Sequence, residues 1–177
     1  MNRLFGLVIL SVIFVQCGQD KDTLIQKNHL GKIGRNTTIE ELDKIFEKDS
    51  IEKIPTNASL IREYNVFGIN GKLDLTIVPS VTNDSLSGLE HVKIYTSRYS
   101  TEKGISVTST FKDIADNYSI DKIEPSFNAA ILFVDELNAT ISLNKKDLGL
   151  DEFDMSDIQQ GQIPDEASIM YITLWFE

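Results

Sequence analysis

The stretch GISVTSTFKDIADNYSIDKI, residues 104–123, repeats a pattern found earlier in the chain as GRNTTIEELDKIFEKDSIEKI, residues 34–54. Each stretch runs from a glycine through hydroxyl residues into a short amphipathic segment and then into a short strand-like segment. A threonine three residues before a carboxylate is the capping-box signature of a helix start. The repetition predicts two related halves, about residues 31–96 and 104–177, each built from a helix and antiparallel strands.

Three capping boxes are available at the two predicted helix starts: Thr37 with Glu40, Thr38 with Glu41, and Thr110 with Asp113. After the first start, apolar residues at positions 39, 42, 45 and 46 recur at the spacing of a helix face that packs on a core. Carboxylates in a first helical turn also stabilise the helix dipole. We therefore interpret these acids as structural and not as an acid/base pair.

Asn70 and Gly71 give the strongest local turn signal, because this pair suits the two positive-φ positions of a type I′ hairpin. A two-residue loop predicts a register that pairs Tyr64 with Ile77, Val66 with Leu75, Phe67 with Asp74, and Ile69 with Lys72. The polar residues 79–88 are predicted to form a loop before the next strand.

Two later segments are predicted to be the most buried strands. Residues 129–134, AAILFV, form a continuous apolar run of strand length. Residues 168–176 are apolar on both alternating faces, which predicts a strand inside the sheet. The expected fold is α+β: a single domain over residues 31–177, with an antiparallel sheet and two or three helices on one face.

The N-terminal sequence is typical of an exported protein. Arg3 precedes an apolar run over residues 4–15, and residues 1–16 are predicted to be a signal peptide. Twelve residues rise only about 18 Å as a helix, which is too short to cross a bilayer. Cys17, the single cysteine, follows the run and is predicted to accept lipid, the alternative being a buried thiol in a hydrophobic segment.

Residues 18–29 have a small and polar composition, which predicts that residues 17–30 are a lipid-anchored tether. Removal of residues 1–16 takes away only Arg3, so 16 basic and 27 acidic residues remain, a formal charge of −11. This charge disfavours a nucleic-acid partner and disfavours contact between the domain and anionic lipid. The membrane is therefore expected to be a partner only through the lipid on Cys17.

No motif for a catalytic or cofactor site is present. Two histidines, scattered glycines and a single cysteine form no triad, phosphate loop or metal-ligand cluster, so no catalytic, cofactor-binding or metal residue is predicted. Asp151, Asp154 and Asp157 fall every three residues, and a solvated surface and a cation site are both open readings. Tyr171 and Trp175 share one face of the last predicted strand. These five residues form the expected interaction surface, the alternative being that helices cover the aromatic rings.

Four motifs carry a family resemblance: FVQC at residues 14–17, T-T-x-x-x-L at 37–42, T-x-x-x-I at 110–114 and IPDEASIxYIxLWF at 163–176. With them the chain resembles a set of exported lipoproteins of Bacteroidota, and the resemblance carries across no catalytic residue. The tandem arrangement also looks like the beta-lactamase-inhibitor and outer-membrane assembly lipoprotein type. That analogy implies a concave sheet that binds another protein.

These observations predict a bacterial lipoprotein, exported and anchored in the cell envelope at the outer membrane, which works as a binding module and not as an enzyme. Its partner is expected to be a protein or another envelope component. Two alternatives stay open at this point. One is an inhibitor or immunity-type protein against a basic enzyme, which the acidic charge would suit. The other is a hydrolase of envelope glycans that uses paired carboxylates.

Overall fold

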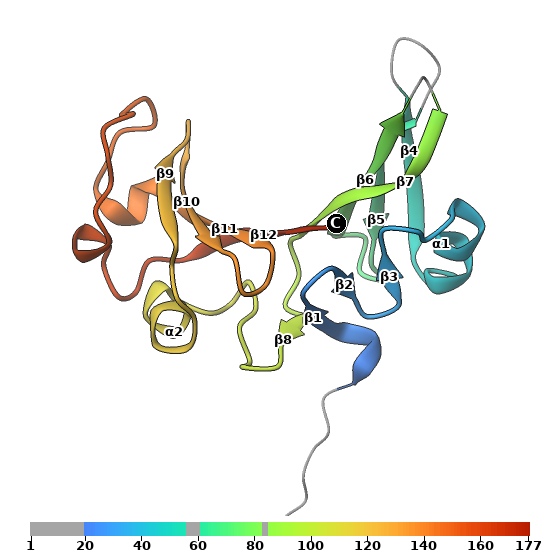
Figure 1. Ribbon diagram of the computed structural model, residues 1–177, viewed down its shortest axis with the longest axis horizontal. Helices are drawn as coiled ribbons and strands as arrows, with labels where there is room; N and C mark the ends of the chain where they lie inside the picture. The colour runs from blue at the N-terminus through green and yellow to red at the C-terminus, as the bar shows by residue number, and fades with distance from the viewer. Residues whose placement is uncertain (1–19, 56–60, 83–84) are drawn as a thin grey trace, which may run out of the picture.

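The computed structural model describes residues 20–55, 61–82 and 85–177. This part of the chain is mostly β: twelve strands form one sheet of eight and one of four, and the α-helices number two, of seven residues each. Figure 1 shows the large sheet spread along the long axis of the molecule, with the small sheet beneath its middle.

The eight-stranded sheet consists of two meanders that meet at their last strands. Its spatial order is β4-β5-β6-β7-β12-β11-β10-β9, with every neighbouring pair antiparallel. The bounds are β4 (Ser50–Pro55), β5 (Ile61–Phe67), β6 (Leu73–Thr82), β7 (Ser85–Ile94), β9 (Lys122–Pro125), β10 (Ala129–Val134), β11 (Ala139–Asn144) and β12 (Ile169–Trp175). A short helix precedes each meander: α1 (Ile39–Ile45) before β4 and α2 (Phe111–Asn117) before β9.

The four-stranded sheet is made of very short strands. Its order is β3-β2-β1-β8, from β1 (Leu24–Gln26), β2 (His29–Leu30), β3 (Ile33–Gly34) and β8 (Ser100–Thr101), with β8 parallel to β1. Three single-turn 3₁₀ segments complete the regular structure of the described residues: η1 (Lys21–Thr23), η2 (Lys145–Leu148) and η3 (Gln160–Gln162).

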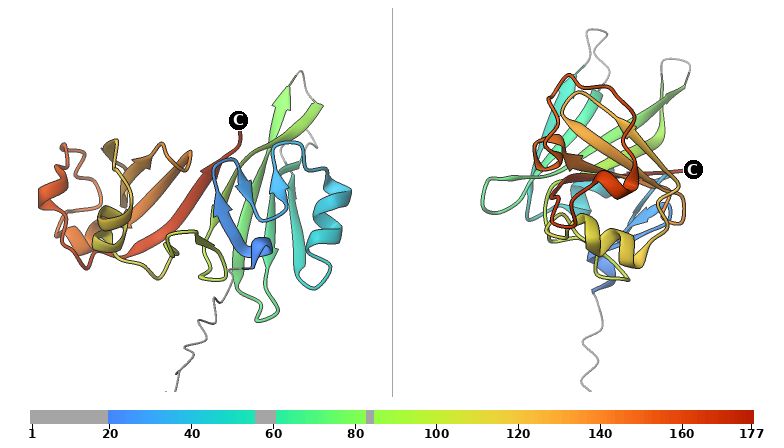
Figure 2. Two further views of the ribbon diagram at one scale, coloured as in Figure 1. Left: turned by 60° about the horizontal axis from the view of Figure 1, so that its bottom comes forward. Right: turned by 90° about the vertical axis from the view of Figure 1, so that its left-hand side faces the viewer.

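The core lies between the large sheet and a layer formed by the two helices and the small sheet (Figures 1 and 2). One row of paired residues crosses all eight strands and is apolar throughout: Ile51, Val66, Leu75, Ile94, Ile172, Ile141, Leu132 and Ile123. Leu42 from α1, Ile114 from α2 and Ile25 from β1 belong to the same buried cluster as the middle of this row. The helices and the small sheet therefore cover one face of the large sheet.

The expected α+β fold with two or three helices on one face is wrong. The helices are much shorter than the strands, and the sheets dominate the described residues. Three departures cause the difference. The first helix ends at Ile45, residues 24–26 and 29–30 of the expected tether form strands, and the predicted loop over residues 79–88 is mostly strand in β6 and β7. Pro79 fits there because the register shifts on both sides of it, which relaxes the need for a ladder hydrogen bond.

Several local predictions are confirmed. The boxes at Thr38 with Glu41 and at Thr110 with Asp113 make both reciprocal bonds, whereas the alternative at Thr37 does not cap a helix. Strand β10 spans the predicted 129–134, and β12 lies inside the sheet between β7 and β11.

The hairpin register is confirmed for two pairs, Tyr64 with Ile77 and Val66 with Leu75. A bulge after Val66 then pairs Phe67 with Leu73, so the predicted pairing of Phe67 with Asp74 is wrong and the loop is longer than two residues.

The polar tether expected over residues 17–30 differs from the structure. Residues 24–26 and 29–30 are strands of the small sheet, and Ile25 and Leu30 are almost fully buried. The signal peptide of residues 1–16 and the lipid-acceptor Cys17 lie outside the described residues. Within the described part, no helix has the length and apolar character that a membrane crossing needs.

Candidate binding face

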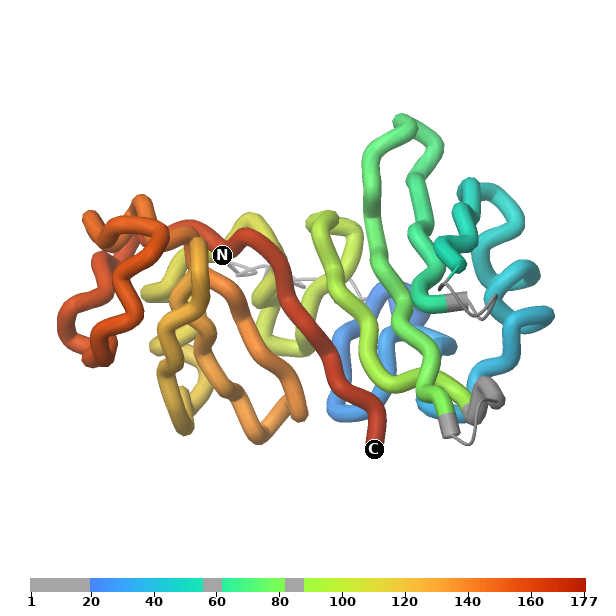
Figure 3. Tube along the Cα trace, turned by 90° about the horizontal axis from the view of Figure 1, so that it is seen from above, coloured from blue at the N-terminus to red at the C-terminus, as the bar shows by residue number. Residues whose placement is uncertain are grey.

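The face of the large sheet opposite the helices carries a second row of paired residues, one position along from the apolar row. Its members are Glu52, Asn65, Thr76, Lys93, Thr173, Thr140, Phe133 and Lys122. Because successive side chains in a strand point to opposite faces, this mixed row faces away from the core. Figure 3 looks onto this side, with β12 crossing the middle and the small sheet behind it. We call it the open face.

Four rings lie in two pairs where β7 and β12 lie side by side at the centre of the open face: His91 with Trp175, and Tyr95 with Tyr171, one pair on each side of Lys93 and Thr173. We call them the aromatic cluster. The centroids of the His91 and Trp175 rings are 4.6 Å apart, and those of Tyr95 and Tyr171 are 5.7 Å apart. Nζ of Lys93 lies 5.7 Å from the centroid of Tyr171, at cation–π range. Trp175 is 36% exposed, so its ring is accessible to a partner.

Burial shifts the pKa of two side chains in the aromatic cluster, His91 and Tyr95. Burial lowers the pKa of His91, which keeps this imidazole neutral at pH 7. Its Nδ1 lies 3.7 Å from the carboxylate of Glu90, too far for a hydrogen bond, and makes no hydrogen bond within the described part of the chain. Burial also raises the pKa of Tyr95, although a hydrogen bond with Thr76 opposes the shift. The cluster therefore offers neutral, partly apolar rings beside one cation, Lys93.

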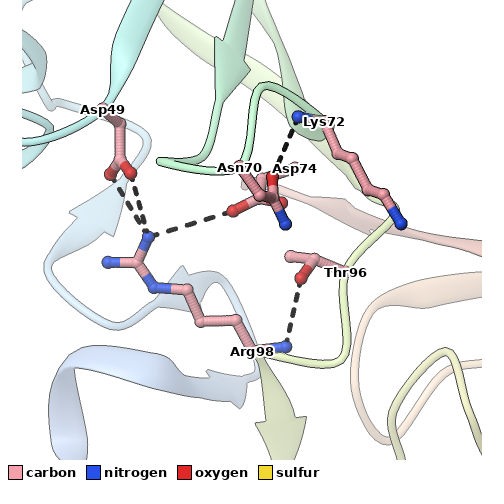
Figure 4. A network of polar contacts seen from close by, with 6 residues as sticks. All are labelled: Asp49, Asn70, Lys72, Asp74, Thr96 and Arg98. Atoms are coloured by element: carbon pink, nitrogen blue, oxygen red, sulfur yellow. Dashed lines mark hydrogen bonds and ion pairs between the residues drawn. The ribbon is translucent and has the colours of Figure 1, made fainter.

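Away from the aromatic cluster, three charged side chains, Arg98, Asp49 and Asp74, connect separate segments of the first meander. Nη1 of Arg98 is 3.2 Å from Oδ2 of Asp49 and 4.0 Å from Oδ2 of Asp74 (Figure 4). The side chains of Asp49 and Asp74 are only 5% and 11% exposed. Burial is the main cause of the raised pKa of Asp74, which Arg98 partly offsets. One guanidinium that bridges two carboxylates in this way fixes the segment after β7 to Asp49, just before β4, and to β6.

A groove of about 610 Å³ lies beside α1 and the small sheet. Its cationic side chains include Lys32, Arg35 and Lys44. Lys32 is already paired with Asp22 at 2.6 Å, and Arg35 donates to the carbonyl of Phe176 at 3.4 Å. Glu41 and Glu177 also line the groove, so its charges are mixed and two of its cations already have internal partners.

The acidic stretch predicted as part of the interaction surface lies in the connection between η2 and η3. Asp154 accepts hydrogen bonds from the backbone N–H and hydroxyl of Ser156, and Asp147 accepts the same pair of bonds from Ser168. These bonds lower the pKa of both carboxyls. Across the described ranges, no group of three His, Cys, Asp or Glu side chains is arranged to hold a metal ion.

The structure separates the five predicted surface residues into two places. Tyr171 and Trp175 lie on the open face, and the helices cover the opposite face. Asp151, Asp154 and Asp157 lie at the end of the second half, in the connection that follows η2.

His91 and Lys93 were not expected at the site. Their alternation with Val92 and Ile94 places them on the outer side of a strand. The pairing of β7 with β12 joins segments about 80 residues apart, and nothing local in the sequence signals it.

Comparison with known proteins gives the fold and nothing more specific. No family model matches the chain, and no curated protein matches it by sequence. Among solved structures, the uncharacterized protein YfeY from Escherichia coli is similar, with a TM-score of 0.55 and 10% sequence identity. The match covers 88% of this chain and 100% of YfeY. The two proteins thus share an architecture at a sequence identity too low to transfer an activity.

Proposed function

We propose that this protein is a binding module of the bacterial cell envelope, which uses the open face of its eight-stranded sheet to bind another protein. The observation that carries the proposal is the aromatic cluster, which lies at the centre of the sheet where the two meanders meet and in which the Trp175 ring is exposed. Tyr and Trp are the residues most enriched among the energetic anchors of protein interfaces.

The size of the open face supports a protein as the partner. Eight strands at a spacing of about 4.8 Å span about 34 Å, and a strand of six residues, the length of β4, β10 and β11, covers about 20 Å. The resulting area of about 700 Å² approaches the roughly 800 Å² that each partner contributes to a standard interface. A small ligand would instead need a concave pocket that buries most of the ligand's surface, and not a broad face.

Paired substitutions on the open face test the proposal. Tyr171→Ser with Trp175→Ser should reduce recovery of a co-purifying protein from solubilised envelopes at least tenfold. Ile69→Ser is the matched control, because Ile69 is 91% exposed in the hairpin loop before β6. Both variants should keep the thermal midpoint within a few degrees. Equal recovery with the folded double variant would refute binding through the open face.

We propose further that the module is exported and attached to the outer membrane by lipid on Cys17. The support is the signal-like sequence of residues 1–17. Incorporation of radiolabelled fatty acid should occur in the native chain and be lost in Cys17→Ala. Protease treatment of intact cells would then report on which side of the membrane the domain lies. Native protein without label would refute the lipid anchor.

A further inference from the structure

Two loops lie at the end of the molecule farthest from α1 (Figure 1), and both carry exposed apolar side chains. Phe127 lies in the loop between β9 and β10, and Phe153 and Met155 lie in the connection between η2 and η3. The two phenyl rings are perpendicular, with centroids 4.7 Å apart. Phe127, Phe153 and Met155 are 53%, 75% and 59% exposed. We call these three residues the apolar knob.

One buried lysine holds both loops. The backbone N–H of Lys145 donates to the carbonyl of Asn128, next to Phe127, at 3.2 Å. Its side-chain Nζ donates to the carbonyls of Glu152 at 3.3 Å and of Asp154, the two residues that flank Phe153. Lys145 has no exposed surface. A single side chain thus fixes the backbone on both sides of the most exposed aromatic ring of the knob.

Burial of the Lys145 ammonium group costs free energy, which its hydrogen bonds to the backbone around Phe153 offset in part. Taking an ammonium group out of water carries a large desolvation penalty, and here the direct acceptors are main-chain carbonyls and not a carboxylate. The result is an exposed aromatic pair on a backbone that is held in place before any partner arrives. Such preorganisation lowers the entropy lost when a partner binds.

The charges around the knob indicate what kind of partner fits it. Asp151 and Asp157 are exposed on the same connection, and the carboxylate of Glu152 lies 3.7 Å from Lys146. Anionic lipid would be repelled by this acidic border. A protein surface with lysine and arginine at its rim would be attracted to it.

We propose that the apolar knob is a docking site for a second protein, one that offers an apolar pocket rimmed by lysine and arginine side chains. The site is separate from the open face and does not depend on the function proposed for that face. Phe153 is the anchor that enters the pocket, Phe127 supports its ring, and Asp151 and Asp157 meet the basic rim.

Site-specific photo-cross-linking in cells that produce the full chain tests the proposal. p-Benzoylphenylalanine in place of Phe153 should give one protein adduct on irradiation, and the same probe in place of Ile69 serves as the exposed control on a distant loop. The adduct should weaken at least fivefold when Asp151→Asn and Asp157→Asn are added to the probe variant. Glu40→Gln with Glu47→Gln makes the same change in net charge on and beside α1 and should leave the adduct unchanged.

Purification of the adduct partner allows a direct measurement. Phe153→Ala in the otherwise native chain should raise its Kd at least tenfold, and a rise in salt concentration should weaken binding of the native chain. Several outcomes would overturn the proposal: an adduct with lipid, an adduct with a second copy of this chain, no adduct above that of the Ile69 control, or an adduct that the aspartate changes leave intact.

Discussion

Replacement of Lys145 by methionine removes the ammonium group that holds the connection around Phe153 and keeps the length of the side chain. Lys145 is fully buried, and its Nζ donates to the carbonyls of Glu152 and Asp154. Methionine fills a similar volume, so no large cavity forms and the apolar stem of the side chain is largely preserved. The change therefore isolates the two hydrogen bonds.

The expected loss follows from the carbonyls left behind. A buried polar group that loses its partner costs about 1–3 kcal/mol, and two carbonyls are affected. Relief of the desolvation of the ammonium offsets part of this cost. We expect the free energy of unfolding to fall by about 2–4 kcal/mol. At about 1.4 kcal/mol per tenfold change, a local loss of 2 kcal/mol speeds hydrogen exchange by about 30-fold.

The assay is denaturant unfolding combined with hydrogen exchange of individual amides. The amides of Asp154 and Ser156 report on the connection, because they bond to the carbonyl of Asp151 and to the carboxylate of Asp154 respectively. Lys146→Met is the matched control, since the Lys146 side chain is 73% exposed and its change should cost less than about 0.5 kcal/mol. If Lys145→Met behaves like this control in both measurements, the anchoring role of Lys145 is wrong.

Three further predictions concern stability. Thr110→Ala removes the capping box of α2 and should cost about 1 kcal/mol, measured as a fall of about 2–4 °C in thermal midpoint. Gly88→Ala should cost at least about 2 kcal/mol in denaturant unfolding, because φ is +114° and a Cβ would lie 2.4 Å from the carbonyl oxygen of Arg35. Asp74 binds its proton more tightly in the folded state, so its contribution to stability falls as pH rises from about 3.8 through its raised pKa. Asp74→Asn should remove that fall in a pH series of unfolding curves, and an unchanged profile would contradict the role of burial.

Local sequence signals located much of the regular structure. Each capping box depends on residues three positions apart, and a six-residue apolar run such as residues 129–134 fits few structures other than a buried strand. The hairpin register was right where Val66 meets Leu75 and wrong beyond it. After the bulge Asp74 is buried beside Arg98, and an added Cβ at Gly68 would lie 2.7 Å from its carboxylate. Turn chemistry alone does not reveal these contacts.

Long-range pairing explains most of what the sequence could not predict. Residues 24–26 pair with β2 on one side and, on the other, with β8, about 75 positions later. A three-residue strand has no periodicity to detect, and the polar neighbours of Leu24 and Ile25 resemble a linker. The ring contacts on the open face also depend on pairing between distant segments. Tyr171 and Trp175 were predicted to share a side, whereas their contacts with Tyr95 and His91 follow from the pairing of β7 and β12.

The buried lysine was hidden from sequence reasoning for a different reason. Lys145 follows a buried strand and precedes Lys146, and an exposed lysine pair is the expectation for that composition. Only the return of residues 152–154 over its side chain supplies the carbonyls that make burial tolerable. The acidic stretch of residues 151–157, for which a cation site was one open reading, therefore binds the ammonium group of Lys145 through the main-chain carbonyls of Glu152 and Asp154.

The two meanders differ in the length of the connection before their last strand, and Lys145 begins the longer one. In the first meander only residues 83 and 84 separate β6 from β7, whereas residues 145–168 separate β11 from β12. A meander does not need so long a connection, and long connections in compact domains are usually either functional or disordered. Lys145 is the first residue of the connection and binds the carbonyls on both sides of Phe153. The long connection between β11 and β12 is thus anchored at its start by Lys145 and exposes the Phe153 ring near its middle. We therefore assign this connection a role in binding and not in folding.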